Sequence, residues 1–292
     1  MKPIVFAHFG NSNYLPLALE IARKFNPDTP IYLLGDEENK NHSSRLGINY
    51  RAYADYKSGP LGEFVANFQY ISNIEGDLHK KIHFFCFVRW FMLYEFMVQE
   101  NIKGVWYFDS DIYVCRNLAK RDDLFSEYEM ALMNKICANT ACINTQKVLK
   151  KYTGLAISLF QDKSFIKKQK AIVEKTSKGY EFCDMTIWGE YQKVFSNFKY
   201  SPILGETSQI IDGETFDHLL VTDRADQIEP DPVWKMCNRG DAWLKEITYK
   251  NDGAYCYHIP SQKSIRMNTL NTGRLDIGIK RDIYKNLVKV FI

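Results

Sequence analysis

Residues 105–111 read Val-Trp-Tyr-Phe-Asp-Ser-Asp, a short apolar run that ends abruptly in two acids separated by one residue. The apolar part predicts a buried β-strand. In open α/β sheets, ligands bind beyond the carboxyl ends of the strands, and Asp109 and Asp111 occupy that position here. Two carboxylates so close repel each other unless a cation lies between them, and oxygen ligands suit Mg²⁺ or Mn²⁺. The segment therefore predicts a strand with a metal site at its end; the alternative is a solvated turn in which an Asp caps a helix.

The segments before this strand alternate between short apolar runs and helical spacing. Residues 4–9 and 31–34 are compact apolar runs, 15–25 has helical periodicity, and 78–100 reads as a long helix that leads into residue 105. This alternation predicts an α/β fold with a mainly parallel central sheet and helices on both faces. Further strands are expected over 47–53, 130–133 and 141–144, further helices over 146–160, 167–178 (polar and solvated) and 184–195, an irregular insertion over 201–243, and a hairpin over 246–259.

The composition is that of an ordered globular protein. Of 292 residues, 46% are hydrophobic and 25% charged, with only 16 Gly and 9 Pro. No internal repeat or flexible linker is visible, so residues 1–272 are expected to form one domain. Residues 273–292 carry five cations and two anions and are expected to form a basic amphipathic tail. Its apolar stripe either packs on the domain or lies on an anionic membrane surface as a peripheral contact.

Charge and cysteine content exclude several classes of protein. The net charge of +3 is too small for a nucleic-acid binder that tracks phosphates. The seven cysteines are scattered, without Cys-x-x-Cys spacing, so reduced thiols are expected. The beginning of the sequence shows no export signal, and the apolar stretch 84–98 is interrupted by charges, so it is expected to be a core helix of a cytoplasmic protein.

The strand that ends in Asp-x-Asp resembles the D-x-D motif of GT-A fold glycosyltransferases. The opening residues 4–7, followed by Asn13-Tyr14, a helix and 26–31, are similar to the nucleotide-binding start of the retaining family that includes glycogenin and bacterial lipooligosaccharide galactosyltransferases. Residues 8–12 look like a small insertion relative to that family. The resemblance implies a single GT-A, Rossmann-like domain with a small C-terminal hairpin and helix.

The resemblance also implies an activity. A sugar, in this family a hexose, would pass with retention from a nucleotide-diphosphate donor, a UDP-sugar, to a hydroxyl of a glycan or lipid-linked acceptor. The setting would be bacterial surface polysaccharide synthesis, at the inner face of the plasma membrane where the acceptor is a lipid. Mn²⁺ or Mg²⁺ would be the cofactor.

A late segment, Tyr255 to Lys263, resembles the family's His-x-x-Gly-x-x-Lys motif, although the Gly is absent and the spacing is one residue shorter. The resemblance implies that the metal ligands are Asp109, Asp111 and His258, and that Lys263 contacts the diphosphate. The implied contacts of the nucleotide-sugar are Ala7, His8, Asn13, Tyr14, Arg89, Asp109, Ser110, Asn139 and Lys263, with Asn144 a weaker match.

Arg89 and Asp184 are the candidate catalytic residues. Arg89 lies in the apolar helix and needs a charged partner, which Glu95 cannot easily be because it lies about 240° round the helix. The partner is either a structural acid or, as the resemblance implies, the D-x-D acids and the donor sugar. Asp184 resembles the Asp of the family's Asp-Gln pair near the donor sugar, with Met185 in place of the Gln. The alternative role for Asp184 is a helix N-cap.

Two other functions are alternatives for this sequence. A sugar-phosphate nucleotidyltransferase shares the α/β architecture, but such enzymes carry a Gly-rich phosphate loop near the N-terminus. Residues 9–12 (Phe-Gly-Asn-Ser) lack those glycines. A non-catalytic relative that binds nucleotide or glycan would fit the altered segment around His258 and the Met at position 185.

Overall fold

A computed structural model gives the fold of the chain. It describes residues 1–10, 15–56, 59–110, 112–114, 117–122, 125–132, 138–176 and 181–195, together with short strands at 200–201, 210–211, 214–215, 256–258, 268–269 and 273–274.

Among these residues, a seven-stranded mixed sheet forms the centre of the molecule, in the order β3-β2-β1-β4-β7-β6-β8. Strands β3, β2, β1 and β4 are parallel to one another, β7 is antiparallel to both β4 and β6, and β6 is parallel to β8. The chain runs from β1 outward through β2 and β3, and then returns to the other side of β1 with β4. The strands are β1 (Ile4–His8), β2 (Ile31–Gly35), β3 (Asn49–Ala52), β4 (Val105–Asp109), β6 (Met130–Leu132), β7 (Thr140–Ile143) and β8 (Tyr200–Ser201).

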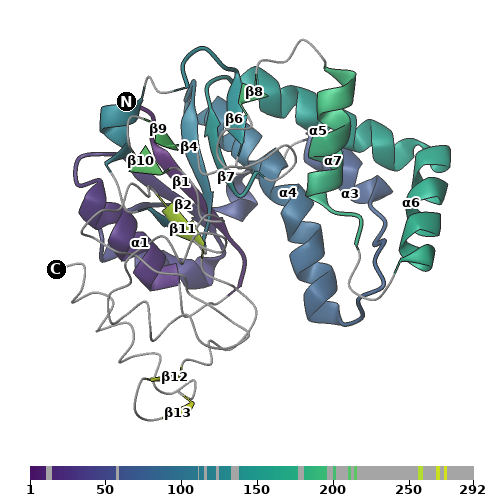
Figure 1. The fold of residues 1–292 in the computed structure, drawn as a ribbon, viewed down its shortest axis with the longest axis horizontal. Coiled ribbons are helices and arrows are strands. Elements are labelled where there is room, and N and C mark those ends of the chain that lie inside the picture. The colour runs from purple at the N-terminus through teal and green to yellow at the C-terminus, as the bar shows by residue number, and fades with distance from the viewer. Residues whose placement is uncertain are drawn as a thin grey trace.

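Helices cover both faces of this sheet (Figure 1). One face packs on α1 and the other on a group that includes α4, α5 and α7. The helices are α1 (Leu15–Phe25), α2 (Lys40–Ser44), α3 (Gly59–Asn67), α4 (Asp77–Gln99), α5 (Gln146–Gln161), α6 (Lys163–Lys175) and α7 (Asp184–Val194), with 3₁₀ turns η1 (Glu37–Asn39), η2 (Tyr53–Tyr56) and η3 (Leu118–Arg121). The remaining strands are β5 (Ile112–Val114), β9 (Ile210–Ile211), β10 (Glu214–Thr215), β11 (Cys256–His258), β12 (Asn268–Thr269) and β13 (Gly273–Arg274).

The alternation of side chains along β1 divides the core in two. Ile4 and Phe6 point to the α1 side, and Val5 and Ala7 to the α4 side; all four are buried. The predicted α/β class, with a mainly parallel sheet and helices on both faces, is therefore confirmed.

Helix α4 is apolar nearly all round, because it is enclosed between the sheet, α3 and α5. Ten of its residues are buried, and Arg89 is one of them. The expectation of a core helix here is confirmed. Within the part of the chain that the structure describes, no helix is both long and apolar enough to cross a membrane.

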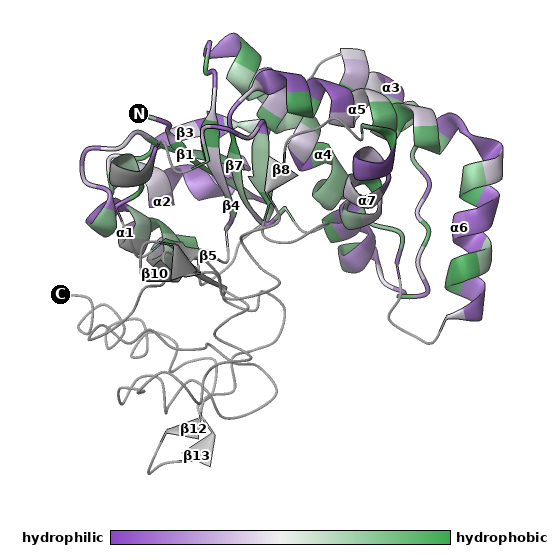
Figure 2. Cartoon of the chain, turned by 45° about the horizontal axis from the view of Figure 1, so that its top comes forward, coloured by the Kyte–Doolittle hydropathy of each residue, from purple (hydrophilic) through white to green (hydrophobic). Residues whose placement is uncertain are grey.

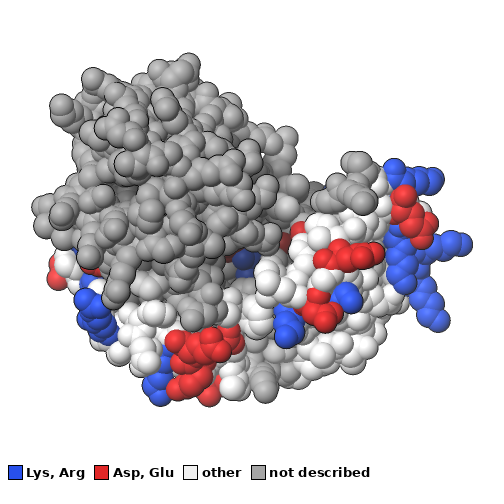
Figure 3. Space-filling model, turned by 90° about the horizontal axis from the view of Figure 1, so that it is seen from below, with Lys and Arg blue, Asp and Glu red and all other residues white. Residues whose placement is uncertain are grey.

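Helix α6 differs from the prediction of a solvated helix over 167–178. It begins at Lys163, ends at Lys175, and buries Ile166, Gln169 and Val173 along one stripe. Figure 2 shows hydrophilic and hydrophobic residues alternating along α6, as expected for a helix with one packed face. Its exposed lysines contribute to the positive charge at the α6 end of the molecule in Figure 3.

Most other predicted elements are present with shifts of at most two residues at their ends. Helices α2 and α3 and strand β5 were not predicted. The insertion over 201–243, the hairpin turn at 251–253 and the tail 273–292 lie largely outside the described residues. The cysteines whose side chains are described, Cys86, Cys142 and Cys183, are free thiols.

Two glycines give a matched test of the packing. A Cβ at Gly104 would lie 2.8 Å from the Ile143 carbonyl oxygen, whereas a Cβ at Gly154, exposed on α5, would have no atom within 4 Å. We expect Gly104→Ala to lower the free energy of unfolding by about 1–3 kcal/mol, because the backbone of β7 must move. Gly154→Ala should raise it by about 1 kcal/mol through helix propensity. Urea denaturation measures both, and a neutral or stabilising Gly104→Ala would contradict the close approach of the two segments.

Candidate active site

The candidate site lies where β1 and β4 end side by side. The strands are parallel and Ala7 is in register with Asp109. Because the chain leaves these strands in opposite directions across the sheet, this edge is a topological switch point, where α/β proteins bind ligands. Just beyond it, His8 Nδ1 and Ser110 Oγ are 2.7 Å apart, and both residues are buried. A hydrogen bond therefore joins the ends of the two strands at the candidate site.

Arg89 connects the strand end to α7. One guanidinium nitrogen, Nη1, donates to Asp109 Oδ1 at 2.6 Å, and the other, Nη2, donates to Asp184 Oδ2 at 2.7 Å. The exposed fraction of the side chain is 11% for Arg89, 21% for Asp109 and 7% for Asp184. The structure thus shows the contact between Arg89 and the first D-x-D acid that the resemblance implies. The catalytic roles of Arg89 and Asp184 remain predictions.

Two aromatic donors complete the arrangement. The Tyr107 hydroxyl donates to Asp109 Oδ1 at 2.8 Å, and the Trp90 indole Nε1 donates to Asp184 Oδ2 at 2.9 Å. The guanidinium carbon of Arg89 lies 5.0 Å from the centroid of the Trp90 ring and 5.9 Å from that of Tyr107. The cation is therefore held by two carboxylates and by two ring systems.

Burial and charge act against each other on this cation. Burial lowers the pKa of Arg89, but the nearby Asp109, Tyr107 and Asp184 raise it more, so the pKa stands well above its ordinary value. For Tyr107, burial is the main cause that raises the pKa well above the ordinary value. Its hydroxyl therefore keeps its proton and acts as a donor to Asp109.

The capping alternative for Asp184 is wrong. Helix α7 begins at Asp184 itself, its N-cap is Cys183, and the cap makes no side-chain hydrogen bond. The Asp184 side chain instead forms the tertiary contacts with Arg89 and Trp90, and its Oδ1 accepts no hydrogen bond from any described residue. A negative charge in the first turn of α7 also lies favourably in the field of the helix.

The segment before α7 is anchored to α4 by two histidines. His83 Nε2 lies 2.7 Å from the Phe182 carbonyl oxygen, and His79 Nε2 lies 2.8 Å from Glu181 Oε2. His83 is buried, and among the described residues its Nδ1 has no hydrogen-bond partner. The neutral tautomer with the proton on Nε2 satisfies this geometry. Burial is the main cause that lowers the pKa of His83.

The segment after β1 is held by residues that follow β2. Gly10 N donates to Asp36 Oδ2 at 2.6 Å, and Asn39 Nδ2 donates to the Gly10 carbonyl oxygen at 3.0 Å. Gly10 has φ +76°, a conformation that favours glycine. These contacts fix the chain on the carboxyl side of β1, within the insertion expected at 8–12.

The residues after Asp111 approach the late His segment. Strand β5 pairs antiparallel with β11, and Ile112 is in register with His258. The pairing brings the backbone of His258 next to the end of the D-x-D motif, and its role as a metal ligand stays a prediction. Within the described part of the chain, no three His, Cys, Asp or Glu side chains form a metal site; of the three expected ligands, only Asp109 has a described side chain.

The other expected contacts fall into three groups. The Asn139 carbonyl oxygen accepts a hydrogen bond from Asp109 N at 2.7 Å, so Asn139 borders the site. The Asn144 side chain donates to the carbonyl oxygens of Phe125 and Tyr128, which is a structural role. Four expected site residues lie outside the described residues, namely Asn13, Tyr14, Asp111 and Lys263.

Sequence reasoning missed Trp90, Tyr107 and Asp36. Tyr107 carried a usable signal, because side chains two apart on a strand share a face, so it lies on the side of Asp109. Asp36 follows directly after a predicted strand, where ligands are expected. Nothing in the sequence pairs Trp90 with Asp184.

No protein-family model matches the sequence, and no curated protein matches it. Similar solved structures include the galactosyltransferase LgtC in complex with donor and acceptor sugar analogs, with 14% identity, a TM-score of 0.44 and coverage of 97% of this chain and 95% of that one. Mouse xyloside xylosyltransferase 1 in its apo form has 10% identity, a TM-score of 0.43 and coverage of 67% and 82%. The glycosyltransferase GlyE of Streptococcus pneumoniae TIGR4 has 16% identity, a TM-score of 0.40 and coverage of 97% and 60%. All three are glycosyltransferases by name.

His83 makes the stability depend on pH. Its pKa in the folded protein is lowered, so below pH 6.5 the unfolded chain binds a proton that the folded chain excludes. The free energy of unfolding should therefore fall as the pH drops from 7.5 to 5, by up to about 1.4 kcal/mol per pH unit from this residue. In His83→Gln, whose amide can still donate to Phe182, the slope measured by urea denaturation should be smaller. An unchanged slope in His83→Gln, or an equal loss of slope in the control His42→Gln on α2, would contradict this assignment.

The two ion pairs of Arg89 predict a specific pattern of stability. Arg89→Met leaves two carboxylates facing each other without a cation and should lower the free energy of unfolding by about 3–5 kcal/mol. Adding Asp184→Asn to Arg89→Met should restore part of that loss, because one uncompensated charge is removed. Thermal and urea unfolding of the single and double variants measure this, and a double variant that is less stable than Arg89→Met would exclude charge repulsion as the cause.

Proposed function

We propose that this chain is a metal-dependent glycosyltransferase that moves a sugar from a nucleotide-diphosphate donor, a UDP-sugar, to a hydroxyl of an acceptor. The observation that carries the proposal is the arrangement at the end of β4, where Arg89 bridges Asp109 of the D-x-D motif and Asp184 of α7. Asp109, at the switch-point edge, would hold the metal that binds the diphosphate. Asp184, joined to Asp109 through Arg89, would accept a hydrogen bond from the sugar.

The nucleotide would bind at the ends of β1 and β4. Ala7 and His8 end one strand, Ser110 follows the other, and the hydrogen bond between His8 and Ser110 keeps the two ends together. We assign Asn13 and Tyr14 to the same nucleotide on the basis of the family resemblance, with Asn139 at the border of the site.

The donor set fits a hard divalent cation such as Mn²⁺ or Mg²⁺. Asp109 and Asp111 offer oxygen, and the register of β11 with β5 brings His258, a nitrogen ligand, next to the same turn. These three residues would hold the ion, which when bound stabilises the negative charge that grows on the leaving diphosphate. Lys263 would add a positive charge to the same phosphates.

The chain's own residues would position the sugar. Arg89 bridges both carboxylates, so a ligand meets the two acids at a set separation. Asp184 Oδ1 accepts no hydrogen bond from the described residues and would accept one from a sugar hydroxyl. Exposed by 7%, the Asp184 side chain offers this oxygen in a site with little competing water.

The finer features of the proposal rest on the sequence resemblance. They are a hexose donor, retention at the anomeric carbon, a glycan or lipid-linked acceptor, a role in bacterial surface polysaccharide synthesis, and a cytoplasmic site of action. A peripheral membrane contact through residues 273–292 would suit a lipid-linked acceptor.

Asp109→Asn tests the metal assignment. Titration calorimetry of UDP against the wild-type chain should show binding with Mn²⁺ that is lost with EDTA. Asp109→Asn should weaken the Mn²⁺-dependent binding at least about tenfold, which corresponds to about 1.4 kcal/mol, because an anionic ligand is removed. The control Asp28→Asn, in the exposed loop before β2, should bind as the wild type does.

Turnover then separates the classes of function. Release of UDP from a panel of UDP-sugars supports a glycosyltransferase. Formation of pyrophosphate from UTP and a sugar phosphate would show a nucleotidyltransferase, and UDP binding without turnover would show a non-catalytic relative. Equal UDP affinity with Mn²⁺ and with EDTA would contradict metal dependence.

A further inference from the structure

We propose that Trp90 and Tyr107 are positioning residues of the candidate site. The Trp90 indole fixes the orientation of Asp184, and the Tyr107 hydroxyl fixes that of Asp109. This inference rests on the proposed function. It goes beyond it because it assigns the geometry of the two carboxylates to two aromatic donors of the core.

The need for these donors follows from the way Arg89 is used. An arginine that meets one carboxylate with two parallel N–H groups fixes both the position and the rotation of that carboxylate. Arg89 instead gives Nη1 to Asp109 and Nη2 to Asp184, so each carboxylate receives a single bond from it. A single bond sets a distance but leaves the carboxylate able to rotate about it. A second donor restricts that rotation, because a carboxylate oxygen accepts hydrogen bonds preferentially along its lone-pair directions.

Each carboxylate has such a second donor, and it reaches the same oxygen as Arg89 does. Asp109 Oδ1 accepts from Arg89 at 2.6 Å and from Tyr107 at 2.8 Å. Asp184 Oδ2 accepts from Arg89 at 2.7 Å and from Trp90 at 2.9 Å. In both acids, the bonds from Arg89 and from the aromatic donor thus meet at one oxygen, which helps to set the orientation of the carboxylate.

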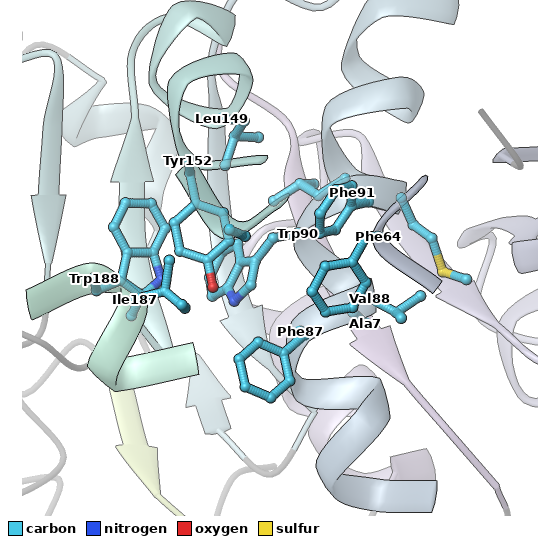
Figure 4. Close-up of a cluster of buried hydrophobic side chains, with 14 of the residues drawn as sticks. Ala7, Phe64, Phe87, Val88, Trp90, Phe91, Leu149, Tyr152, Ile187 and Trp188 are labelled. Carbon is cyan, nitrogen blue, oxygen red and sulfur yellow. The ribbon is translucent and has the colours of Figure 1, made fainter. Parts of the chain in front are cut away.

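The two donors are themselves rigid. Trp90 and Tyr107 are fully buried, and their ring centroids are 4.7 Å apart. Trp90 also packs on Tyr152 and Trp188, with ring centroids 5.9 and 5.3 Å away, in the cluster that Figure 4 shows. Tyr107 lies two residues before Asp109 on the same face of β4, so the distance between them depends on one strand alone. The orientation of the two carboxylates therefore depends on side chains that are packed in the core.

The two donors should affect different steps. Asp109 is the proposed ligand of the metal and, through it, of the diphosphate, so loss of the Tyr107 hydroxyl should appear in Mn²⁺-dependent affinity. Asp184 is the proposed contact of the sugar, so loss of the Trp90 indole N–H should appear in turnover, with nucleotide affinity retained.

The same cluster supplies matched controls. Tyr152 and Trp188 are also buried, and their rings stack with centroids 4.2 Å apart. Within the described part of the chain, the Tyr152 hydroxyl and the Trp188 indole nitrogen have no hydrogen-bond partner. Tyr152→Phe and Trp188→Phe therefore make the same chemical changes as Tyr107→Phe and Trp90→Phe, at neighbouring positions, without removing a bond to a carboxylate.

The experiment compares these four variants with the wild type by calorimetry of UDP with Mn²⁺, by kcat and KM for hydrolysis of whichever UDP-sugar the wild type turns over, and by melting temperature. We expect Tyr107→Phe to weaken Mn²⁺-dependent UDP binding about tenfold and Trp90→Phe to lower kcat about tenfold with UDP affinity within twofold. Tyr152→Phe and Trp188→Phe should keep affinity and kcat within twofold of the wild type, whatever their melting temperatures. Should Trp90→Phe not fold, Trp90→His, which retains a ring N–H, should keep more turnover than Trp90→Leu.

The outcomes are distinguishable. A wild-type chain that shows neither Mn²⁺-dependent UDP binding nor turnover overturns the proposed function and this inference with it. A wild-type chain that binds and turns over, with Tyr107→Phe and Trp90→Phe no different from their matched controls, overturns the positioning roles alone. Equal losses in all four variants would show that general packing of the aromatic cluster, and not the two hydrogen bonds, supports activity.

Discussion

The candidate site depends on one buried cation shared between two acids. A guanidinium inside an apolar helix is costly without partners, and Arg89 has Asp109 from β4 on one side and Asp184 from α7 on the other. The same two bonds join α4, the end of β4 and the start of α7. Because removal of Arg89 would leave two acids without a cation, the three elements are held to one arrangement. This is the property that a preorganised ligand site requires.

Aromatic side chains pack around this cation. Trp90, Tyr107, Tyr152 and Trp188 form a packed group beside the ion pairs, and two of the four also donate hydrogen bonds to the acids. Aromatic side chains suit this place because they bury a large apolar surface and carry one polar atom. For the remaining two, Tyr152 and Trp188, the polar atom has no partner among the described residues, and their rings stack on each other. The cluster thus serves both the core and the site.

The sequence allowed much of this fold to be predicted, for identifiable reasons. The helix at Leu15–Phe25 was predicted with its observed bounds because its periodicity is strong and Pro27 and Pro30 follow it. Strand β5 has three residues and α2 has five, which is too short for periodicity to show. Helix α6 was read as solvated because lysines dominate it, while its contact with the core depends on only a few positions.

The site, too, could be predicted only in part from the sequence. The need of Arg89 for an acid could be predicted from its apolar neighbours, but its second partner, Asp184, lies 95 residues away, and a carboxylate at the start of a helix has the local features of a cap. An Asp at a helix start can cap the helix or bond a distant residue. The sequence shows the position that favours capping, but it does not show the contact between Asp184 and Arg89.

The turn after β4 shows how strand pairing and side-chain bonding combine at this edge. Asp109 is held by Arg89 and Tyr107 from the α4 side of the sheet, and Ser110 is held by His8 from the neighbouring strand. Ile112 is buried again, and its backbone is in register with His258. The chain is therefore fixed immediately before and immediately after position 111, by contacts that come from four different segments. A ligand that uses the acids of this turn needs both to be oriented before it arrives, since energy spent on ordering them would be lost from binding. For Asp109, the described acid of this turn, the contacts with Arg89 and Tyr107 supply that order from the core.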